Sequence, residues 1–149
     1  MLAGALAAAM PAPAGRAATS ELTVADRLSG VALGGFDPVA YFSEGAALEG
    51  RPEHEYMLDG MAWRFRNAGN RAAFARDPAV YRPGFGGYDP VVLAEQRPVP
   101  GDPRIWAIHE SRVYLFATEG SRRRFLDDPQ RLLQTAGEAW PAVVRTLVP

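Results

Sequence analysis

The side chains of this sequence that could do acid–base chemistry are few and widely spaced. Asp37 and Asp89 each follow a Gly-Gly-aromatic triplet and precede a proline, and His109 closes an apolar run. Two carboxylates and a histidine are groups that general acid–base catalysis uses. An aspartate before a proline also accepts hydrogen bonds from nearby backbone N–H groups and so fixes a turn. Two interpretations of Asp37 and Asp89 therefore stay open, a turn-forming role and a paired-carboxylate site.

The sequence has no cysteine, which excludes thiol nucleophiles, disulfides and thiolate metal ligands. Its second histidine, His54, lies between two glutamates and reads as an exposed strand-edge residue. No group of residues has the spacing of a metal site or of a phosphate-binding glycine loop. We therefore predict no catalytic residue, no metal site and no cofactor.

Six large aromatic residues that carry a polar atom recur through the chain. They are most simply explained as core residues. A pocket lined by some of them, with a phenol or an indole N–H facing inward, is the alternative. The six aromatic residues are Tyr41, Trp63, Tyr81, Tyr88, Trp106 and Tyr114. The residues we consider as candidate ligand-binding residues are Asp37, Tyr41, Trp63, Tyr88, Asp89 and His109.

Length and charge restrict the classes of function. The chain has 149 residues, a mass of 16.1 kDa and 48% hydrophobic residues, enough for one substantial core. The net charge is −1, and the longest run of like charge is Arg122-Arg123-Arg124, which reads as a solvated helix face. Nucleic acid is therefore not expected as a partner.

The first eighteen residues differ in composition from the rest. An Ala/Leu run from Leu2 to Met10 is followed by Pro11-Ala12-Pro13-Ala14, a small-residue site of the kind that signal peptidase accepts. The run is too short to span a membrane, and it lacks a basic segment before it. Residues 1–18 are therefore either an export signal, which would place the protein in the periplasm or outside the cell with no transmembrane segment in its mature form, or a disordered tail.

Two copies of one pattern make up most of the remaining chain, in a single expected domain over residues 19–149. The possible repeats are 34–83 and 86–135. The hairpin and helix residues match at a shift of fifty-one positions, as Trp63 with Tyr114 and Phe74 with Phe125. The Gly-Gly phrases match at fifty-two, which a one-residue loop difference would explain. A fixed internal period indicates a structural unit that is used twice.

Each copy predicts a hairpin followed by short helices, which is an α+β fold. Strands at 53–58 and 61–65 flank Asp59-Gly60, a strong hairpin signal. Strands at 105–108 and 113–116 flank a turn at 110–112. Asn67 and Thr118 are expected to cap helices that run to Phe74 and Leu126, and Asp77-Pro78 and Asp128-Pro129 are expected to begin further helical turns.

Three further expectations concern packing. Residues 39–42 are rich in β-prone side chains and follow Asp37-Pro38, so they read as a short extended run. A separate amphipathic helix is expected at 139–147. Because neither half is large enough to fold alone, Phe65, Phe74, Phe116 and Phe125 are expected to lie in one shared core.

Several phrases in this order resemble the bacterial YHS-domain proteins, which are small and often exported. The likeness spans about residues 33–144. Its motifs are Gly35-Phe36-Asp37-Pro38-Val39-Ala40-Tyr41-Phe42, Trp63-Arg64-Phe65, Asp77-Pro78, Tyr81-Arg82-Pro83, Phe85-Gly86-Gly87-Tyr88 and Ala139-Trp140-Pro141. The resemblance implies a compact α+β domain of poorly defined activity, related to modules that are attached to heavy-metal-transporting ATPases and are sometimes presumed to bind metal. Asp89 stands where that family's cysteine is expected, which replaces a soft metal ligand by a hard one.

Three classes of function follow. A non-catalytic exported binding module for a small ligand or a metal fits the resemblance and the shortage of catalytic groups. A protein–protein interaction or structural module is the alternative. A hydrolase-like enzyme is the third, and it would require Asp37, Asp89 and His109 to converge in one cavity.

Overall fold

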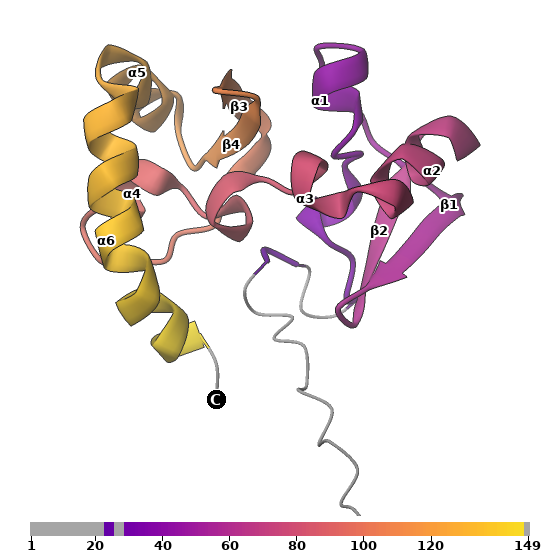
Figure 1. The fold of residues 1–149 in the computed structure, drawn as a ribbon, viewed down its shortest axis with the longest axis horizontal. Coiled ribbons are helices and arrows are strands. Elements are labelled where there is room, and N and C mark those ends of the chain that lie inside the picture. The colour runs from indigo at the N-terminus through magenta and orange to yellow at the C-terminus, as the bar shows by residue number, and fades with distance from the viewer. Residues whose placement is uncertain (1–22, 26–28, 148–149) are drawn as a thin grey trace, which may run out of the picture.

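The computed structural model describes residues 23–25 and 29–147, and the predicted α+β fold class is confirmed. The expected export signal at residues 1–18 lies outside the described residues. The first half contains α1 (Ala40–Ser43), β1 (Arg51–Leu58), β2 (Met61–Phe65), α2 (Ala68–Arg76) and α3 (Pro78–Tyr81). The second contains α4 (Pro90–Leu93), β3 (Asp102–His109), β4 (Arg112–Phe116), α5 (Glu119–Asp127) and α6 (Pro129–Leu147). The two halves lie side by side, with α3 between them (Figure 1).

The two hairpins have the same register. Strand β1 pairs with β2, and β3 pairs with β4, each as an antiparallel two-stranded sheet. Tyr56 faces Trp63 in the first hairpin, and Ala107 faces Tyr114 at the corresponding place in the second. Each hairpin also has an irregularity near the start of its first strand, between Arg51 and Glu55 or between Asp102 and Trp106. The halves therefore share backbone geometry as well as a sequence pattern.

The Gly-Gly phrases form matching tight turns before each hairpin, at Leu33–Gly35 (η2) and Gly84–Gly87 (η3). Gly35 and Gly87 have φ values of 87° and 90°, a conformation that glycine adopts without steric cost. Each turn closes on the strand entrance, since Gly50 N donates to Gly35 O and Gly101 N donates to Gly87 O, at 2.8 and 2.9 Å.

The longer helices α2 and α5 begin where the sequence predicts. The Asn67 side chain accepts from Asn70 N at 2.8 Å, and the Thr118 hydroxyl accepts from Ser121 N at 3.0 Å. These bonds satisfy backbone donors that an N-terminal helical turn leaves without partners. Helix α2 thus follows β2 in the same way as α5 follows β4.

Residues 40–42 lie in α1 and Val39 is its N-cap, so the predicted extended run at 39–42 is wrong. Asp37 Oδ1 accepts from Val39 N and Ala40 N at 2.8 and 3.3 Å. These bonds hold the backbone donors at the start of α1 in a helical turn, and this local capping outweighs the β propensity of the side chains.

One further helix start agrees with the prediction, and one helix differs from it. Asp77 precedes α3 but makes no capping bond with its side chain; the helix begins at Pro78, whose missing N–H removes one donor that would need a cap. The expected separate helix at 139–147 is instead the second part of α6, which is continuous from Pro129 to Leu147. Its buried residues Leu132, Ala136, Ala139 and Val143 follow at the three- and four-residue spacing of a single apolar stripe.

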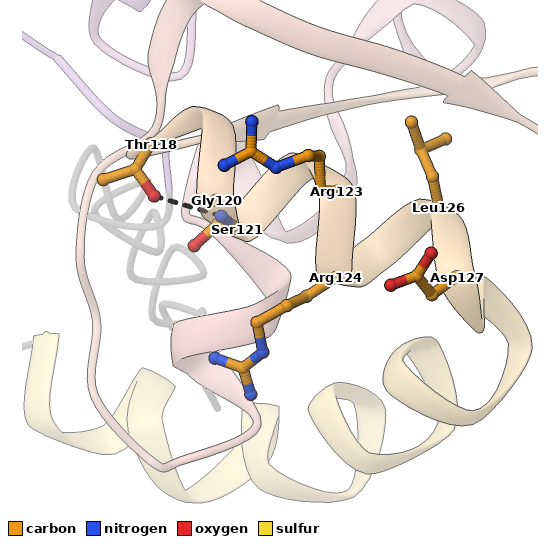
Figure 2. A pocket seen from close by; sticks show the side chains of 7 residues that line it. All are labelled: Thr118, Gly120, Ser121, Arg123, Arg124, Leu126 and Asp127. Carbon is orange, nitrogen blue, oxygen red and sulfur yellow. Dashed lines mark hydrogen bonds between the residues drawn. The ribbon is translucent and has the colours of Figure 1, made fainter.

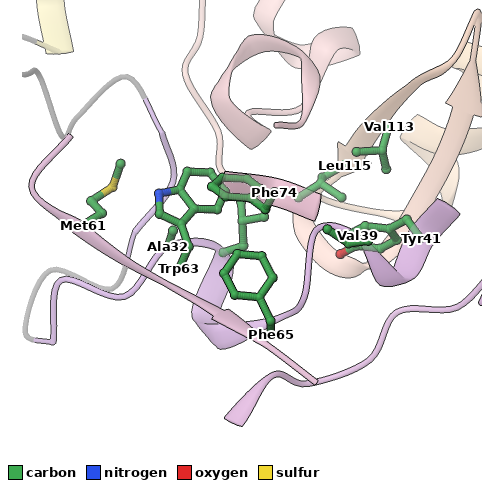
Figure 3. Close-up of a cluster of buried hydrophobic side chains, with 10 residues drawn as sticks. Ala32, Val39, Tyr41, Met61, Trp63, Phe65, Phe74, Val113 and Leu115 are labelled. Atoms are coloured by element: carbon green, nitrogen blue, oxygen red, sulfur yellow. The ribbon is translucent and has the colours of Figure 1, made fainter. Parts of the chain in front are cut away.

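The apolar interior consists of neighbouring clusters. The first cluster holds Phe65 and Phe74, together with Trp63, Met61 and Tyr41 (Figure 3). The second holds Phe116 and Phe125, with Val91, Tyr114 and Leu132. All four phenylalanines are fully buried, but the two pairs lie in different clusters, which corrects the expectation of a single cluster. Each pair packs within its own half, because each helix covers its own hairpin.

The halves meet where strand β4 enters the first cluster. Val113 and Leu115 come from the second half and pack among buried residues of the first. Tyr41 crosses in the opposite direction, with its ring 5.2 Å from that of Trp106 and its hydroxyl donating to the Pro103 carbonyl at 2.8 Å. Both halves therefore contribute to the first cluster.

Candidate functional site

Asp37 is a fully buried carboxylate that holds three parts of its half together. Oδ1 accepts from Val39 N and Ala40 N at the start of α1. Oδ2 accepts from Arg66 N, after β2, and from the Asn70 side-chain amide in α2, both at 2.8 Å. A buried carboxylate must be compensated by donors of this kind. The turn-forming interpretation from the sequence therefore accounts for the two bonds to Oδ1, whereas the two bonds to Oδ2 come from donors distant in the chain.

Asp89 occupies the equivalent place in the second half and is also fully buried. Its Oδ1 accepts from Val91 N and Val92 N at 2.9 and 3.4 Å, and its Oδ2 accepts from Ala117 N at 2.8 Å. Among the described residues no fourth donor reaches the Asp89 side chain, because Ser121 stands where the first half has Asn70 and its side chain is shorter. Asp89 therefore forms the same turn with one donor fewer.

The structure does not bring the carboxylates and His109 together. His109 lies at the end of β3, where its ring stands perpendicular to Phe125 at 6.0 Å, and its nearest carboxylate is that of Glu110 at 3.9 Å. Within residues 23–25 and 29–147, no hydrogen bond joins His109 to Asp37 or Asp89. The arrangement therefore supplies no acid–base pair that includes either buried carboxylate.

The Tyr41 hydroxyl is engaged between the halves. Burial raises the pKa of this phenol well above its usual value, and the negative charges of Asp102 and Asp37 raise it further. The folded protein therefore retains this proton at pH values where the unfolded chain loses it.

The Tyr41→Phe variant is expected to lose less stability than the natural protein as pH rises above about 10, although it lacks the Tyr41 hydrogen bond to Pro103 at every pH. A raised phenol pKa contributes stability below the unfolded pKa, about 10, and this contribution is lost as pH rises through the folded pKa, by about 1.4 kcal/mol per pH unit. Urea unfolding between neutral pH and pH of about 11 should show a steeper fall for the natural protein. Tyr114, whose pKa burial also raises, acts equally in both proteins. Parallel pH profiles would contradict the role of Tyr41.

Trp63 and Arg82 each carry a buried donor, and the Arg82 guanidinium lies over the ring of Trp63. Trp63 is 0% exposed, and the Arg82 guanidinium carbon lies 5.7 Å from the centre of its ring system. Neither Trp63 Nε1 nor Arg82 Nε has a hydrogen-bond acceptor among the residues that the structure describes. We call these two nitrogens the donor pair. The indole nitrogen lies on the edge of the ring that is turned toward Met61 in Figure 3.

Sequence reasoning singled out Trp63 and missed Arg82. The indole was a candidate because of its polar atom, whereas Arg82, between α3 and Pro83, follows no chemical motif. Its position results from two contacts across the fold: an ion pair with Asp59 in the first hairpin turn, and a bond from Arg112 Nη1 to the Arg82 carbonyl at 3.5 Å. Only tertiary structure brings these groups together.

Tyr88, the remaining candidate, lies at the other end of the second half. It is 9% exposed and packs against Trp140 of α6, with ring centres 6.1 Å apart. The six candidate residues are thus distributed over both halves rather than gathered around one cavity. Their role as ligand-binding residues stays a prediction.

An open, shallow hollow runs along the outer face of α5. Its lining residues are Thr118, Gly120, Ser121, Arg123, Arg124, Leu126 and Asp127 (Figure 2). Arg124 lies 3.7 Å from Glu95, and Asp127 adds a second negative charge. Carboxylates therefore lie near the positive charges of Arg123 and Arg124. Both arginines are exposed, as predicted for a solvated helix face.

Neither a metal site nor a membrane-spanning helix is found in the described part of the chain. Among residues 23–25 and 29–147 no three His, Asp or Glu side chains are placed to hold a metal ion. No helix in the same residues is long and apolar enough to span a membrane. Comparison with family models, with characterised proteins and with solved structures finds no match to this chain.

Proposed function

We propose that this protein is a non-catalytic binding module that holds a small ligand through an acceptor group at the donor pair. The observation that carries this proposal is that Trp63 Nε1 and Arg82 Nε are buried and have no acceptor among the described residues, while the Arg82 guanidinium carbon lies 5.7 Å from the centre of the Trp63 ring. Asp37 and Asp89 support the non-catalytic part, since backbone and amide donors already occupy their oxygens. Binding, rather than acid–base chemistry, is what this arrangement offers.

The energetics favour a ligand that supplies an acceptor. A buried donor without a partner costs about 1–3 kcal/mol, and such groups are rare in native proteins. A ligand oxygen within hydrogen-bond distance of either N–H group would satisfy that donor. The Arg82 side chain is 32% exposed and lies over the ring of Trp63, so its movement would open a path from solvent.

The resemblance to YHS-domain proteins and the expected export belong to the same proposal. The family likeness rests on the motifs between residues 33 and 144, and the export signal rests on the composition of residues 1–18. Together they describe a small module of the periplasm or the extracellular space that binds its ligand there.

The binding proposal predicts a selective change at one tryptophan. The protein has three tryptophans, and their indole N–H groups give separate signals in ¹H–¹⁵N spectra. A mixture of acetate and acetamide should shift the Trp63 indole signal and leave those of Trp106 and Trp140 in place. Trp63→Phe identifies the signal and should remove the response.

An internal water molecule is the outcome that would contradict this function. A strong nuclear Overhauser effect between the Trp63 indole proton and water, unchanged by the mixture, would show that water satisfies the donor pair. Such buried waters are common partners of polar groups in proteins.

Export predicts a defined mature N-terminus. If residues 1–18 include a cleaved signal, mass spectrometry of protein from fractionated cells should find a chain that starts between Gly15 and Thr19. A cytoplasmic protein that retains Met1 would rule out the export signal and leave the alternative of a tail.

A further inference from the structure

We infer that Met57 is a site of reversible oxidative modification, at which a peroxide converts the thioether to a sulfoxide while the protein stays folded. The chain has four methionines and no cysteine, so thioethers are its only sulfur groups. Met1 and Met10 lie outside the described residues, and Met57 and Met61 lie on either side of the first hairpin turn. The accessibility of these two thioethers decides which of them is modified.

The alternation of side chains along β1 turns Met57 toward solvent. Its neighbours Tyr56 and Leu58 pack against the first cluster, and successive side chains of a strand point to opposite faces. Met57 therefore lies on the outer face of the hairpin, where it is 63% exposed. A peroxide in solution can approach this side chain without any opening of the structure.

Met61, just across the turn, is protected. It is 2% exposed and belongs to the first cluster, in which it lies near Trp63 (Figure 3). A peroxide reaches its sulfur only when the hairpin separates from the rest of the core. The same hairpin thus holds one accessible thioether and one inaccessible thioether, and the second serves as an internal reference for the first.

The modification transfers one oxygen atom from hydrogen peroxide to sulfur. A lone pair of the Met57 sulfur attacks one peroxide oxygen, so that the S–O bond forms as the O–O bond breaks. The proton of the transferred oxygen passes to the leaving hydroxide, which becomes water. Sulfur is oxidised by two electrons and the peroxide is reduced by two.

Oxidation of Met57 changes the surface of the protein and leaves its core intact. The new S=O group projects into water, so no buried polar group without a partner is created. For the same reason a methionine sulfoxide reductase can reach the group, and a dithiol then returns it to the thioether as the oxygen leaves in water and the dithiol becomes a disulfide. The modification is therefore reversible in the folded protein.

Hydrogen peroxide tests the site directly. The folded protein is treated at neutral pH, and fragment ions of the peptide that contains Met57 and Met61 assign each added oxygen. Met57 should be oxidised at least about tenfold faster than Met61, whereas in concentrated urea the two rates should agree within about twofold. Equal rates in the folded protein, or faster oxidation of Met61, would overturn the site.

The second hairpin supplies the matched variants. Ile108 has the register position of Met57, since Ile108 pairs with Val113 as Met57 pairs with Ala62, and it is 40% exposed. Met57→Ile therefore removes the sulfur but keeps an apolar side chain that this position accepts, and the first hairpin should then stay unoxidised. Adding Ile108→Met should restore oxygen uptake on the second hairpin. Oxidation of Met61 in Met57→Ile, at the rate of Met57 in the natural protein, would contradict the protection of the core.

Spectra and enzymatic reduction test the rest of the inference. Tryptophan fluorescence of protein oxidised at Met57 should match that of the unmodified protein, because Trp63 lies in the core. Treatment with the reductases for both sulfoxide epimers and a dithiol should return the unmodified peptide. A changed emission spectrum would contradict a modification confined to the surface. A sulfoxide that these enzymes reduce only after the protein is unfolded would contradict its reversibility in the folded state.

Discussion

Replacing Phe74 or Phe125 by alanine is expected to destabilise the protein by about 3–5 kcal/mol. Phe74 is fully buried and contacts the rings of Trp63 and Phe65, with centres 4.8 and 5.1 Å away. Phe125 has the corresponding contacts with Tyr114 and Phe116, at 5.4 and 5.0 Å. Each truncation removes a ring from the centre of one cluster and leaves a cavity.

The same experiment tests whether the halves unfold together. Because Val113 and Leu115 of β4 pack in the first cluster, damage to either cluster should lower the stability of the whole chain. Calorimetry should therefore show one transition, shifted by a similar amount in both variants. Leu126→Ala, at a residue that is 57% exposed beside Phe125, is the control and should change stability by less than about 0.5 kcal/mol. Two transitions, or a folded fragment that ends near Pro83, would indicate independent halves.

Replacing Asp37 by asparagine is expected to destabilise the protein by about 3–5 kcal/mol, and the same change at Asp89 by about 2–3 kcal/mol. An asparagine side chain keeps one acceptor oxygen and places an NH₂ group against the donors at the other. At Asp37 each oxygen serves two donors, so two bonds are lost whichever way the amide faces. At Asp89 the amide can turn its NH₂ toward Ala117 N alone.

Asn70→Ser provides the matched control for this difference, since it gives the first half the residue of the second. It removes one bond to Asp37 Oδ2 and should itself cost about 1–2 kcal/mol. In the Asn70→Ser background, the further change of Asp37 to asparagine should cost no more than the change at Asp89. Chemical unfolding measures all four free energies. Equal costs of the two aspartate changes in the natural background would contradict the donor count.

The sequence predicted the elements whose signals are local. The Asp59-Gly60 hairpin, the caps at Asn67 and Thr118, and the burial of the phenylalanines all depend on residues close together in the chain. The strands begin earlier than predicted, at Arg51 and Asp102, because the irregular pairing at their starts interrupts the alternation of apolar and polar residues.

Features that depend on distant residues were not predictable in the same way. The helical turn at α1 follows from the Asp37 carboxylate, whose Oδ2 accepts hydrogen bonds from donors some thirty residues away. The β-prone residues 39–42 give no indication of these distant contacts. The donor pair brings together Trp63 and Arg82, which helices α2 and α3 separate in the chain. Trp63 was among the candidate residues because an indole N–H is a recognisable donor, but no feature of the sequence marks Arg82 as a second donor.

The paired carboxylate turns also set an order for folding. The bond from Arg66 N to Asp37 spans 29 residues and that from Ala117 N to Asp89 spans 28, whereas the bond between Tyr41 and Pro103 spans 62. Because short loops close at lower entropic cost than long ones, each half can close its own loop before the halves dock. The rate-limiting barrier should then lie at the docking of β4 into the first cluster. Substitutions of Val113 should slow folding because they raise this barrier. Loss of the Asp37 or Asp89 bonds, which form before the barrier, should instead reduce the population of the closed halves from which docking starts.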